Sequence, residues 1–266
     1  MQPLEQPAAI RTVLSFDFDG TLHDPGGEPP VPKRFFDTIR RLREEHGAVW
    51  GINTGRSIPY VVEGMLESGF PFAPDWVVAR EREIYHFDPA GHWHAHETWN
   101  QRCHRAMHAL FHECRELLDV IRHEIREHTG AEWMEVEGDP AGVIARTEEE
   151  MAWILPRVEA LAGGHPHLGW QRNSIWLRFG HRDYHKGSSL AEVARHYGLG
   201  ATDCFAVGDS HNDFEMLDPR NAAKFACPGN AVAEVKAHVA QLGGYLAERV
   251  YGHGAVEALE YYFPDC

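Results

Sequence analysis

Short apolar runs alternate with amphipathic stretches at both ends of this chain. The runs 13–16, 48–52 and 76–79 are mostly apolar, which is typical of strands buried on both faces of a parallel sheet. Between the first two runs, apolar residues recur at helical spacing, and Gly47 stands where the residue after a helix is expected. This alternation of strand and helix predicts an α/β domain with a parallel sheet.

The middle of the chain follows a different pattern. A polar, histidine-rich stretch from Trp99 to His128 predicts a helix, and two strand-like hairpins come after it. The first hairpin joins 132–136 to 142–146 through Gly138-Asp139-Pro140, and the second joins 167–171 to 174–179 through Arg172-Asn173.

Strand–helix alternation resumes beyond Lys186, with a strand at 204–207. Because hairpins replace the alternation only in the middle, the sequence predicts an α+β insertion within a parallel-sheet domain. We place the insertion at residues 86–181 and the interrupted domain at residues 1–85 and 182–266.

Composition restricts the class of protein. Of the 266 residues 43% are hydrophobic and 24% charged, as in ordinary globular proteins. No run of about 18 apolar residues predicts a membrane-spanning helix, and no basic cluster followed by an apolar run predicts a secretory signal. The five scattered cysteines, including Cys266, indicate free thiols in a reducing compartment, so we expect a cytoplasmic protein.

The formal net charge of −15 argues against two classes of partner. A strongly acidic chain repels nucleic acid and anionic membrane surfaces, so we expect neither as a partner. A small anionic substrate would need a local positive site. No heptad seam or long apolar stripe favours a particular oligomeric state.

Asp17-Phe18-Asp19-Gly20-Thr21 stands where the first strand meets a loop. Sites in parallel sheets form at the carboxyl ends of strands, so both carboxylates would face one crevice. One could act as a nucleophile while the other transfers a proton. Taken alone, the segment could also be an acidic strand end followed by a turn.

Two further motifs suit a bound phosphate. Thr54-Gly55-Arg56 ends the second strand, where a hydroxyl and a glycine amide can donate to phosphate oxygens, although a simple turn explains it as well. Lys186, followed by Gly187, begins a helix, the unfavourable end for a cation unless it reaches an anion. Solvent exposure is the alternative for this lysine.

The segment from Gly208 to Asp213 follows the strand at 204–207 and contains Asp209, Asn212 and Asp213. Paired carboxylates at a strand end suit a hard cation such as Mg²⁺. Each motif alone is ambiguous. Together, a carboxylate pair, a hydroxyl turn, a lysine and metal-type carboxylates, each after a strand or at a helix start, predict an enzyme.

These motifs resemble those of the haloacid dehalogenase superfamily, which match at Asp17/Asp19, Thr54, Lys186 and Asp209/Asp213. The insertion resembles the α+β cap of type IIB, and the chain is similar to the sucrose-phosphatase-like and Cof-like branch. Further matches are Pro74-Asp75-Trp76, Glu83-Ile84-Tyr85 and Arg56-Ser57. Arg80-Glu81-Arg82 departs from the family, in which a glycine-containing turn is frequent. The resemblance implies a Rossmann-like catalytic core.

The resemblance also implies the chemistry. Asp17 attacks phosphorus to form an aspartyl-phosphate, and Asp19 protonates the leaving oxygen and then activates water. Mg²⁺ is the implied cofactor, bound by Asp17, Asp19 through its backbone carbonyl, and Asp209, with Asp213 in support. The implied phosphate-binding residues are Thr54, Gly55, Lys186 and Asn212.

We therefore expect a Mg²⁺-dependent phosphatase that hydrolyses a small phosphomonoester, with a sugar phosphate as the expected substrate. The first alternative is a sugar phosphomutase, which carries the same type of cap. The second is a non-catalytic binding protein on the same fold, against which the intact motifs argue.

The abundant histidines suggest a metal site only weakly. His104, His108 and His112 share one face of the predicted helix, but the charged residues around them favour a solvated surface over a zinc site. His92, His94 and His96 alternate as on one face of a strand, and we expect them to be exposed as well.

Overall fold

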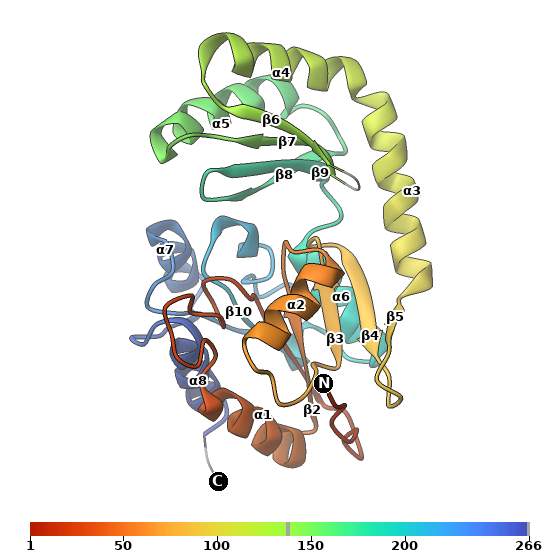
Figure 1. Cartoon of the computed structure of the whole chain (residues 1–266), viewed down its shortest axis with the longest axis vertical. Helices are drawn as coiled ribbons and strands as arrows, with labels where there is room; N and C mark the ends of the chain where they lie inside the picture. The colour runs from red at the N-terminus through yellow and green to blue at the C-terminus, as the bar shows by residue number, and fades with distance from the viewer. Residues whose placement is uncertain (137–138, 265–266) are drawn as a thin grey trace. The chain divides into compact units, whose positions relative to one another are not determined.

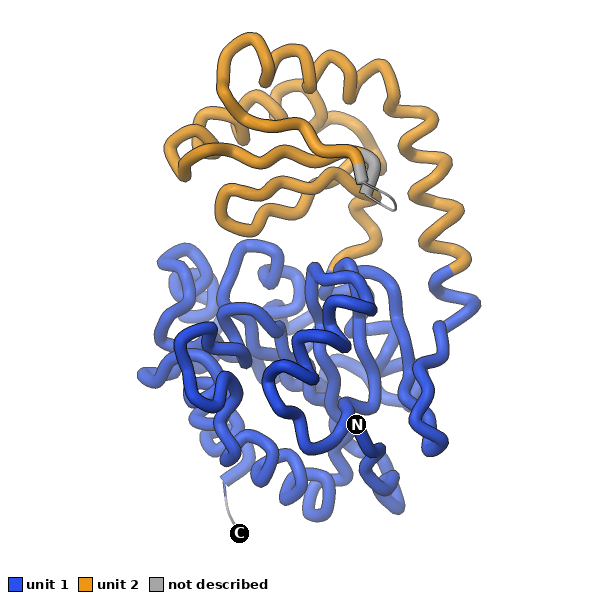
Figure 2. Tube along the Cα trace, viewed as in Figure 1, with its two compact units in different colours: residues 1–100, 186–266 blue, residues 101–185 orange. Residues whose placement is uncertain are grey.

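The computed structural model describes residues 1–136 and 139–264, and the chain divides into two compact units (Figure 2). Unit 1 comprises Met1–Asn100 and Lys186–Cys266, and unit 2 comprises Gln101–His185. The predicted α/β fold with an α+β insertion is confirmed. None of the helices in the described part of the chain is long and apolar enough to cross a membrane.

The units divide at other positions than those expected after Tyr85 and after His181. Tyr85 lies inside a strand, β4 (Glu83–Phe87), that pairs with β3 (Trp76–Ala79) in the sheet of unit 1. β5 (Trp93–Ala95) extends the same sheet, so the histidine-containing segment after Tyr85 belongs to unit 1.

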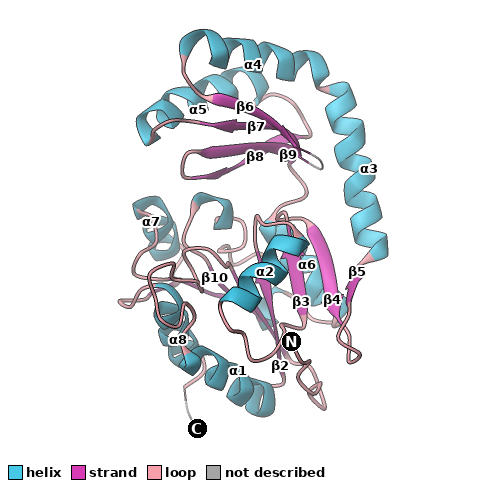
Figure 3. Ribbon diagram, viewed as in Figure 1, coloured by secondary structure: helices cyan, strands magenta, loops and turns pink. Residues whose placement is uncertain are grey.

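Unit 1 is built on an eight-stranded sheet, shown in Figures 1 and 3. The order is β12-β11-β10-β1-β2-β3-β4-β5, parallel from β12 to β3 and antiparallel from β3 to β5. The remaining strands are β1 (Thr12–Phe16), β2 (Ala48–Asn53), β10 (Cys204–Val207), β11 (Lys224–Cys227) and β12 (Tyr245–Leu246). The helices are α1 (Lys33–His46), α2 (Ile58–Glu67), α6 (Lys186–His196), α7 (Ala233–Gln241) and α8 (Tyr251–Tyr262).

Both faces of this sheet are covered, which explains why β1 is buried along its whole length. Leu14 and Phe16 belong to a hydrophobic cluster that also contains residues of α1, α2 and α8. Because side chains alternate along a strand, Val13 and Ser15 point to the other face, where α6 packs against β1, β3 and β4. The near-continuous apolar runs in the sequence reflect this two-sided burial.

Unit 2 is an antiparallel sheet of order β6-β7-β9-β8 with helices against it (Figure 3). Its strands are β6 (Glu132–Val136), β7 (Asp139–Ile144), β8 (Leu168–Asn173) and β9 (Trp176–His181). Its helices are α3, which begins in unit 1 (Glu97–Glu113), α4 (Arg115–His128) and α5 (Glu148–Ala162). Buried residues of α4 and α5 share one hydrophobic cluster with β7 and β9, so these two helices cover one face of the sheet.

Several local predictions differ from the structure. The predicted helix 99–128 is two helices that meet at Cys114, a break that lets Leu110 and Leu118 join the same core. The second hairpin turns at Ser174, which has a φ of 51°, rather than at Arg172-Asn173. The expected Gly138-Asp139-Pro140 turn lies partly outside the described residues, as does Cys266. None of the four described cysteines forms a disulfide.

A buried ion pair joins α1 to the loop before β3. The guanidinium of Arg43 donates two hydrogen bonds of 2.8 Å to the Asp75 carboxylate, which also accepts the Trp50 backbone N–H at 3.0 Å. Both side chains are only 7% exposed. Removing one partner would leave the other charge buried without compensation, which is far more destabilising than losing an exposed pair.

We predict that Asp75→Ala lowers the free energy of unfolding by about 3–5 kcal/mol, because Arg43 is left unpaired. Urea denaturation measures this change. Asp37→Ala, which removes the exposed partner of Arg40 on α1, is the control and should change stability little. An Arg43→Met/Asp75→Asn double variant should be less destabilised than Asp75→Ala. A loss for Asp75→Ala no larger than the control's would contradict this account.

Candidate active site

Three strand ends bring the predicted site residues together. Asp17 directly follows β1, Thr54 follows β2, and Asp209 comes two residues after β10, which neighbours β1 on the opposite side from β2. The Asp17 backbone N–H donates to the Val207 carbonyl at 3.0 Å, and that of Thr54 donates to Val78 at 2.9 Å. These parallel strands run the same way, so their carboxyl ends form one edge on which the site is built.

Lys186, the first residue of α6, supplies the positive charge of this site. Its Nζ lies 2.8 Å from Asp17 Oδ1 and 2.6 Å from Asp213 Oδ1, and the side chain is fully buried. The Lys186 carbonyl accepts a hydrogen bond of 2.9 Å from the Asn53 side chain at the end of β2. The alternative of a solvent-exposed lysine is therefore wrong.

Burial and charge act in opposite directions on this pair. Burial alone would lower the pKa of Lys186, but attraction to Asp17, Asp213 and Glu81 outweighs it and raises that pKa. Burial raises the pKa of Asp17, Lys186 opposes this, and repulsion from Asp213 and Asp209 adds to it. Lys186 thus stays charged, and further positive charge near Asp17 would lower the pKa of that carboxyl and favour its ionised form.

Asp209 lies against the loop that follows β1. Its Oδ1 accepts a hydrogen bond of 2.7 Å from the Thr21 hydroxyl. A Cβ at Gly20, whose φ is +79°, would lie 2.4 Å from Asp209 Oδ2, so both the backbone conformation and the close approach require glycine here. Burial and repulsion from Asp213 raise the pKa of Asp209 to about 6, against the opposing hydrogen bond from Thr21.

Asp213 organises the turn after β10. Its Oδ2 accepts the backbone N–H groups of Asp209 and Ser210 at 2.9 and 3.0 Å, while Oδ1 contacts Lys186. The residue ends a short 3-10 helix, His211–Asp213. Asp213 therefore orients both Asp209 and Lys186.

Asp19 differs from Asp17 and Asp213 because its side chain is 46% exposed and is paired with Arg56 instead of Lys186. Arg56 binds it in bidentate fashion, with Nε 2.7 Å from Oδ2 and Nη2 2.5 Å from Oδ1. The same guanidinium lies over the Phe18 ring, 4.9 Å from its centroid. Any proton transfer by Asp19 requires that this pair open.

The other predicted phosphate-binding residues, Thr54, Gly55 and Asn212, differ in burial and in their partners. The Thr54 side chain is 2% exposed, and its Oγ1 accepts the Arg56 backbone N–H at 3.2 Å, which leaves the hydroxyl proton to donate elsewhere. Gly55 is partly exposed between them. Asn212 is buried, and its side-chain Nδ2 donates to Glu81 Oε1 at 2.7 Å.

Sequence reasoning assigned no role to Glu81. Its side chain is 5% exposed, bonds Asn212, and adds to the negative field at Lys186. Glu81 and Arg80 have φ values of 66° and 50°, a strained region for residues other than glycine. The Arg80-Glu81-Arg82 departure was the available signal, because a non-glycine turn in that conformation needs anchoring contacts.

The carboxylates fit a divalent cation. Asp17, Asp209 and Asp213 each offer an oxygen, and these atoms lie within 4.8 Å of one another. Their repulsion contributes to the raised pKa of Asp17 and Asp209, and a cation at this place would relieve it. Carboxylate oxygens are the ligands that Mg²⁺ prefers.

Comparison with known proteins agrees with this geometry. A family model for haloacid dehalogenase-like hydrolases matches residues 156–246, a segment that contains Lys186, Asp209 and Asp213. This segment, about a third of the chain, is therefore similar to the haloacid dehalogenase-like hydrolases. A phosphoglycolate phosphatase from Methanosarcina acetivorans is 45% identical over 76 residues, which cover 29% of this chain and 31% of that protein. The match thus spans about a third of the length of this curated relative.

Solved structures share the haloacid dehalogenase-like fold over nearly the whole chain. The sucrose-phosphatase from Synechocystis sp. PCC6803, in complex with sucrose and phosphate, has a TM-score of 0.71 at 16% identity and covers 95% of this chain and 98% of that one. A sugar phosphatase of subclass IIB has a TM-score of 0.61 at 17% identity, with 94% and 98% covered. At these identities the likeness is one of fold.

Asp209 yields a pH prediction. Between pH 3.8 and about 6 the folded protein holds a proton on Asp209 that the unfolded chain has released, so this group's contribution to stability falls as the pH rises through that window. Asp209→Asn removes the effect. The measurement is made with EDTA present. From pH 4 to pH 7 the unmodified protein should lose up to about 3 kcal/mol of unfolding free energy relative to Asp209→Asn.

Chemical denaturation at several pH values measures this difference. Addition of Mg²⁺ at pH 7 should stabilise the unmodified protein more than Asp209→Asn, because the ion compensates the repulsion among the carboxylates. A difference that stays constant from pH 4 to pH 7 in EDTA would show that Asp209 ionises in the folded protein as it does in the unfolded chain.

Proposed function

We propose that this protein is a Mg²⁺-dependent phosphatase that hydrolyses a small phosphomonoester, with a sugar phosphate as the substrate class. The observation that carries the proposal is the contact between buried Asp17 and buried Lys186 at the end of β1. A nucleophilic carboxylate must approach a negatively charged phosphoryl group, and a fixed ammonium beside it offsets the repulsion.

In the first step, a carboxylate oxygen of Asp17 forms a bond to phosphorus and the bond from phosphorus to the leaving oxygen breaks. Asp19, released from Arg56 and protonated from solvent, gives that proton to the leaving oxygen, so the product leaves as an alcohol. In the second step, Asp19 takes a proton from water, and the water oxygen attacks phosphorus. Inorganic phosphate forms, and the Asp17 carboxylate is regenerated.

The remaining residues hold the phosphoryl oxygens. An ammonium has three donors, and Lys186 uses two on Asp17 and Asp213, which leaves the third for the phosphoryl group. The Thr54 hydroxyl and the Gly55 amide would donate to other oxygens, together with the second N–H of the Asn212 side chain.

Asp17, Asp209 and the Asp19 carbonyl would hold the magnesium ion, with Asp213 in support. When bound, Mg²⁺ supplies charge that keeps Asp17 ionised and neutralises phosphoryl oxygens. The raised pKa of Asp17 supports this requirement, because positive charge beside the carboxylate lowers that pKa and so favours the ionised nucleophile.

Similar proteins support the substrate class. The sucrose-phosphatase and the subclass IIB sugar phosphatase, which share the fold over nearly the whole chain, favour a sugar phosphate. The relative from Methanosarcina acetivorans is named a phosphoglycolate phosphatase and supports only the broader class of small phosphomonoesters. All three names describe phosphatases, which favours hydrolysis over the phosphomutase alternative.

We predict that Asp17→Asn lowers turnover by more than about 10⁴-fold, because an amide cannot attack phosphorus as a carboxylate does. The assay is phosphate release from a panel of sugar phosphates and other phosphomonoesters, with Mg²⁺ and with EDTA. Asp37→Asn, an exposed substitution on α1, is the control and should retain full activity. Near-normal turnover by Asp17→Asn would refute the nucleophile assignment.

Asp19→Asn should slow both steps by about 10²- to 10⁴-fold, since one residue acts as acid and then as base. Rapid-quench kinetics separates the burst from the steady state. Unchanged rates in both phases would exclude Asp19 from proton transfer.

In the same panel, isomerisation of a sugar phosphate without release of phosphate would support the phosphomutase instead.

A further inference from the structure

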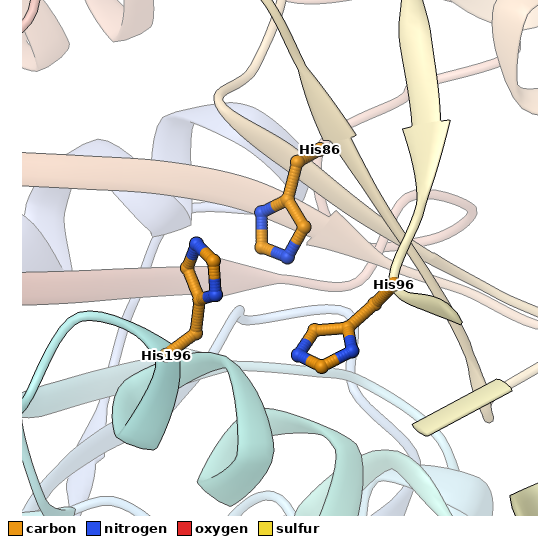
Figure 4. Close-up of side chains that lie close together, drawn as sticks. All are labelled: His86, His96 and His196. Atoms are coloured by element: carbon orange, nitrogen blue, oxygen red, sulfur yellow. The ribbon is translucent and has the colours of Figure 1, made fainter. Parts of the chain in front are cut away.

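Three histidines from three elements of unit 1 lie close together (Figure 4). They are separate from the aspartates of the candidate active site. We call His86, His96 and His196 the three-histidine cluster. His86 is on β4, His96 directly follows β5, and His196 is the last residue of α6. The ring of His86 lies 4.2 Å from that of His196 and 5.6 Å from that of His96, centroid to centroid, and one nitrogen of each ring lies within 4.8 Å of the others.

His86 carries the observation that points to a ligand. Both of its ring nitrogens are buried and have no hydrogen-bond partner. Buried polar atoms are rarely left unpaired, because desolvation without a partner is unfavourable. The lone pair of a neutral imidazole can be satisfied either by a donor or by a metal ion.

Two histidines of the cluster, His86 and His196, have lowered pKa values. Burial, together with the neighbouring His196 and His96, lowers the pKa of His86 to about 3. Burial and the nearby His96 also lower the pKa of His196. These two rings are therefore neutral near pH 7, and a metal ion would displace no proton from their lone pairs.

His96 brings a carboxylate to the same place. Its Nδ1 accepts the Trp99 backbone N–H in a long hydrogen bond of 3.4 Å, which must open, with the ring proton moving to Nδ1, before the Nε2 lone pair can bind a metal ion. That Nε2 lies 3.5 Å from Glu192 Oε1, whose side chain is 6% exposed. A carboxylate beside a metal-bound histidine is a recurrent feature of zinc sites, as a fourth ligand or as a partner that orients the ring.

The helix also favours a cation here. Carbonyl groups at the carboxyl end of a helix carry partial negative charge, and His196 ends α6. Lys186 and the carboxylate site are at the other end of this helix, about 15 Å away at 1.5 Å per residue. The two sites are therefore separate.

We propose that the three-histidine cluster binds a zinc ion, with Glu192 as its carboxylate partner. Nitrogen ligands suit zinc and its transition-metal neighbours, whereas Mg²⁺ and Ca²⁺ prefer oxygen. Zinc–nitrogen bonds of about 2.0–2.1 Å would draw the three rings closer together, since their nearest nitrogens lie within 4.8 Å of one another. The ion would fasten the β4–β5 hairpin to α6, the elements that adjoin the two chain connections to unit 2.

The test is zinc binding by the full chain, measured by competition with a chromophoric chelator in excess Mg²⁺, which occupies the carboxylate site. One zinc ion per chain is expected. His96→Ala and His196→Ala should each weaken binding at least about 100-fold, since loss of even an outer partner reduces affinity about 10- to 100-fold. His253→Ala, an exposed histidine on α8, is the control and should bind zinc normally.

Two further readouts identify the site. Co²⁺ in place of zinc should give the intense visible absorption of a tetrahedral nitrogen site, and zinc should raise the melting temperature of the unmodified protein but not of His196→Ala. Zinc binding that survives both His96→Ala and His196→Ala would overturn the proposal. Zinc binding that is lost in His94→Ala but kept in the cluster variants would also overturn the proposal, because His94 belongs to the separate Asp88–His92–His94 group on the hairpin. An unmodified protein that does not bind zinc would overturn it as well.

Discussion

The contact of Lys186 with Asp17 and Asp213 is the interaction on which the rest of unit 1 depends. Three side chains from β1, α6 and the turn after β10 bring two negative charges and one positive charge into a buried place. An unpaired charge there would be strongly unfavourable, so each partner requires the others. Because α6 begins where the chain returns from unit 2, this contact also fixes where the sheet is resumed.

α6 contacts the candidate active site at its first residue and the β4–β5 hairpin near its last. Lys186 reaches the carboxylates, the Ser189 hydroxyl donates to the Glu81 carbonyl at 3.0 Å, and Glu192 lies beside His96. The strained turn at Glu81 is thus held from α6 on one side and by Asn212 on the other. Rigid support of this kind keeps catalytic groups in position before substrate binds.

Sequence patterns predicted the α/β core because two-sided burial leaves continuous apolar runs, as in β1, β2 and β3. They also indicated the aspartates of the candidate site and Lys186, because each of these residues belongs to a short motif of neighbouring residues. They missed β4, whose residues are mostly half-buried and mixed in character. The alternation of His92, His94 and His96 did indicate a strand, and β5 lies within that segment. The exposure predicted for His104, His108 and His112 is confirmed, but His96 turns inward beside His86 and His196. Pairing of residues 131 positions apart, as in the Asn212–Glu81 contact, has no local signal.

The central claim, that Asp17 carries the phosphoryl group during turnover, is tested most directly by trapping. The protein is mixed with a phosphomonoester that it hydrolyses, and the reaction is quenched in acid during turnover. Borohydride then reduces an acyl phosphate to an alcohol. Peptide mass spectrometry then locates the modified residue. The account predicts homoserine at position 17, and none when substrate is omitted. Continued turnover with an unmodified Asp17, or a modification at another carboxylate, would contradict it.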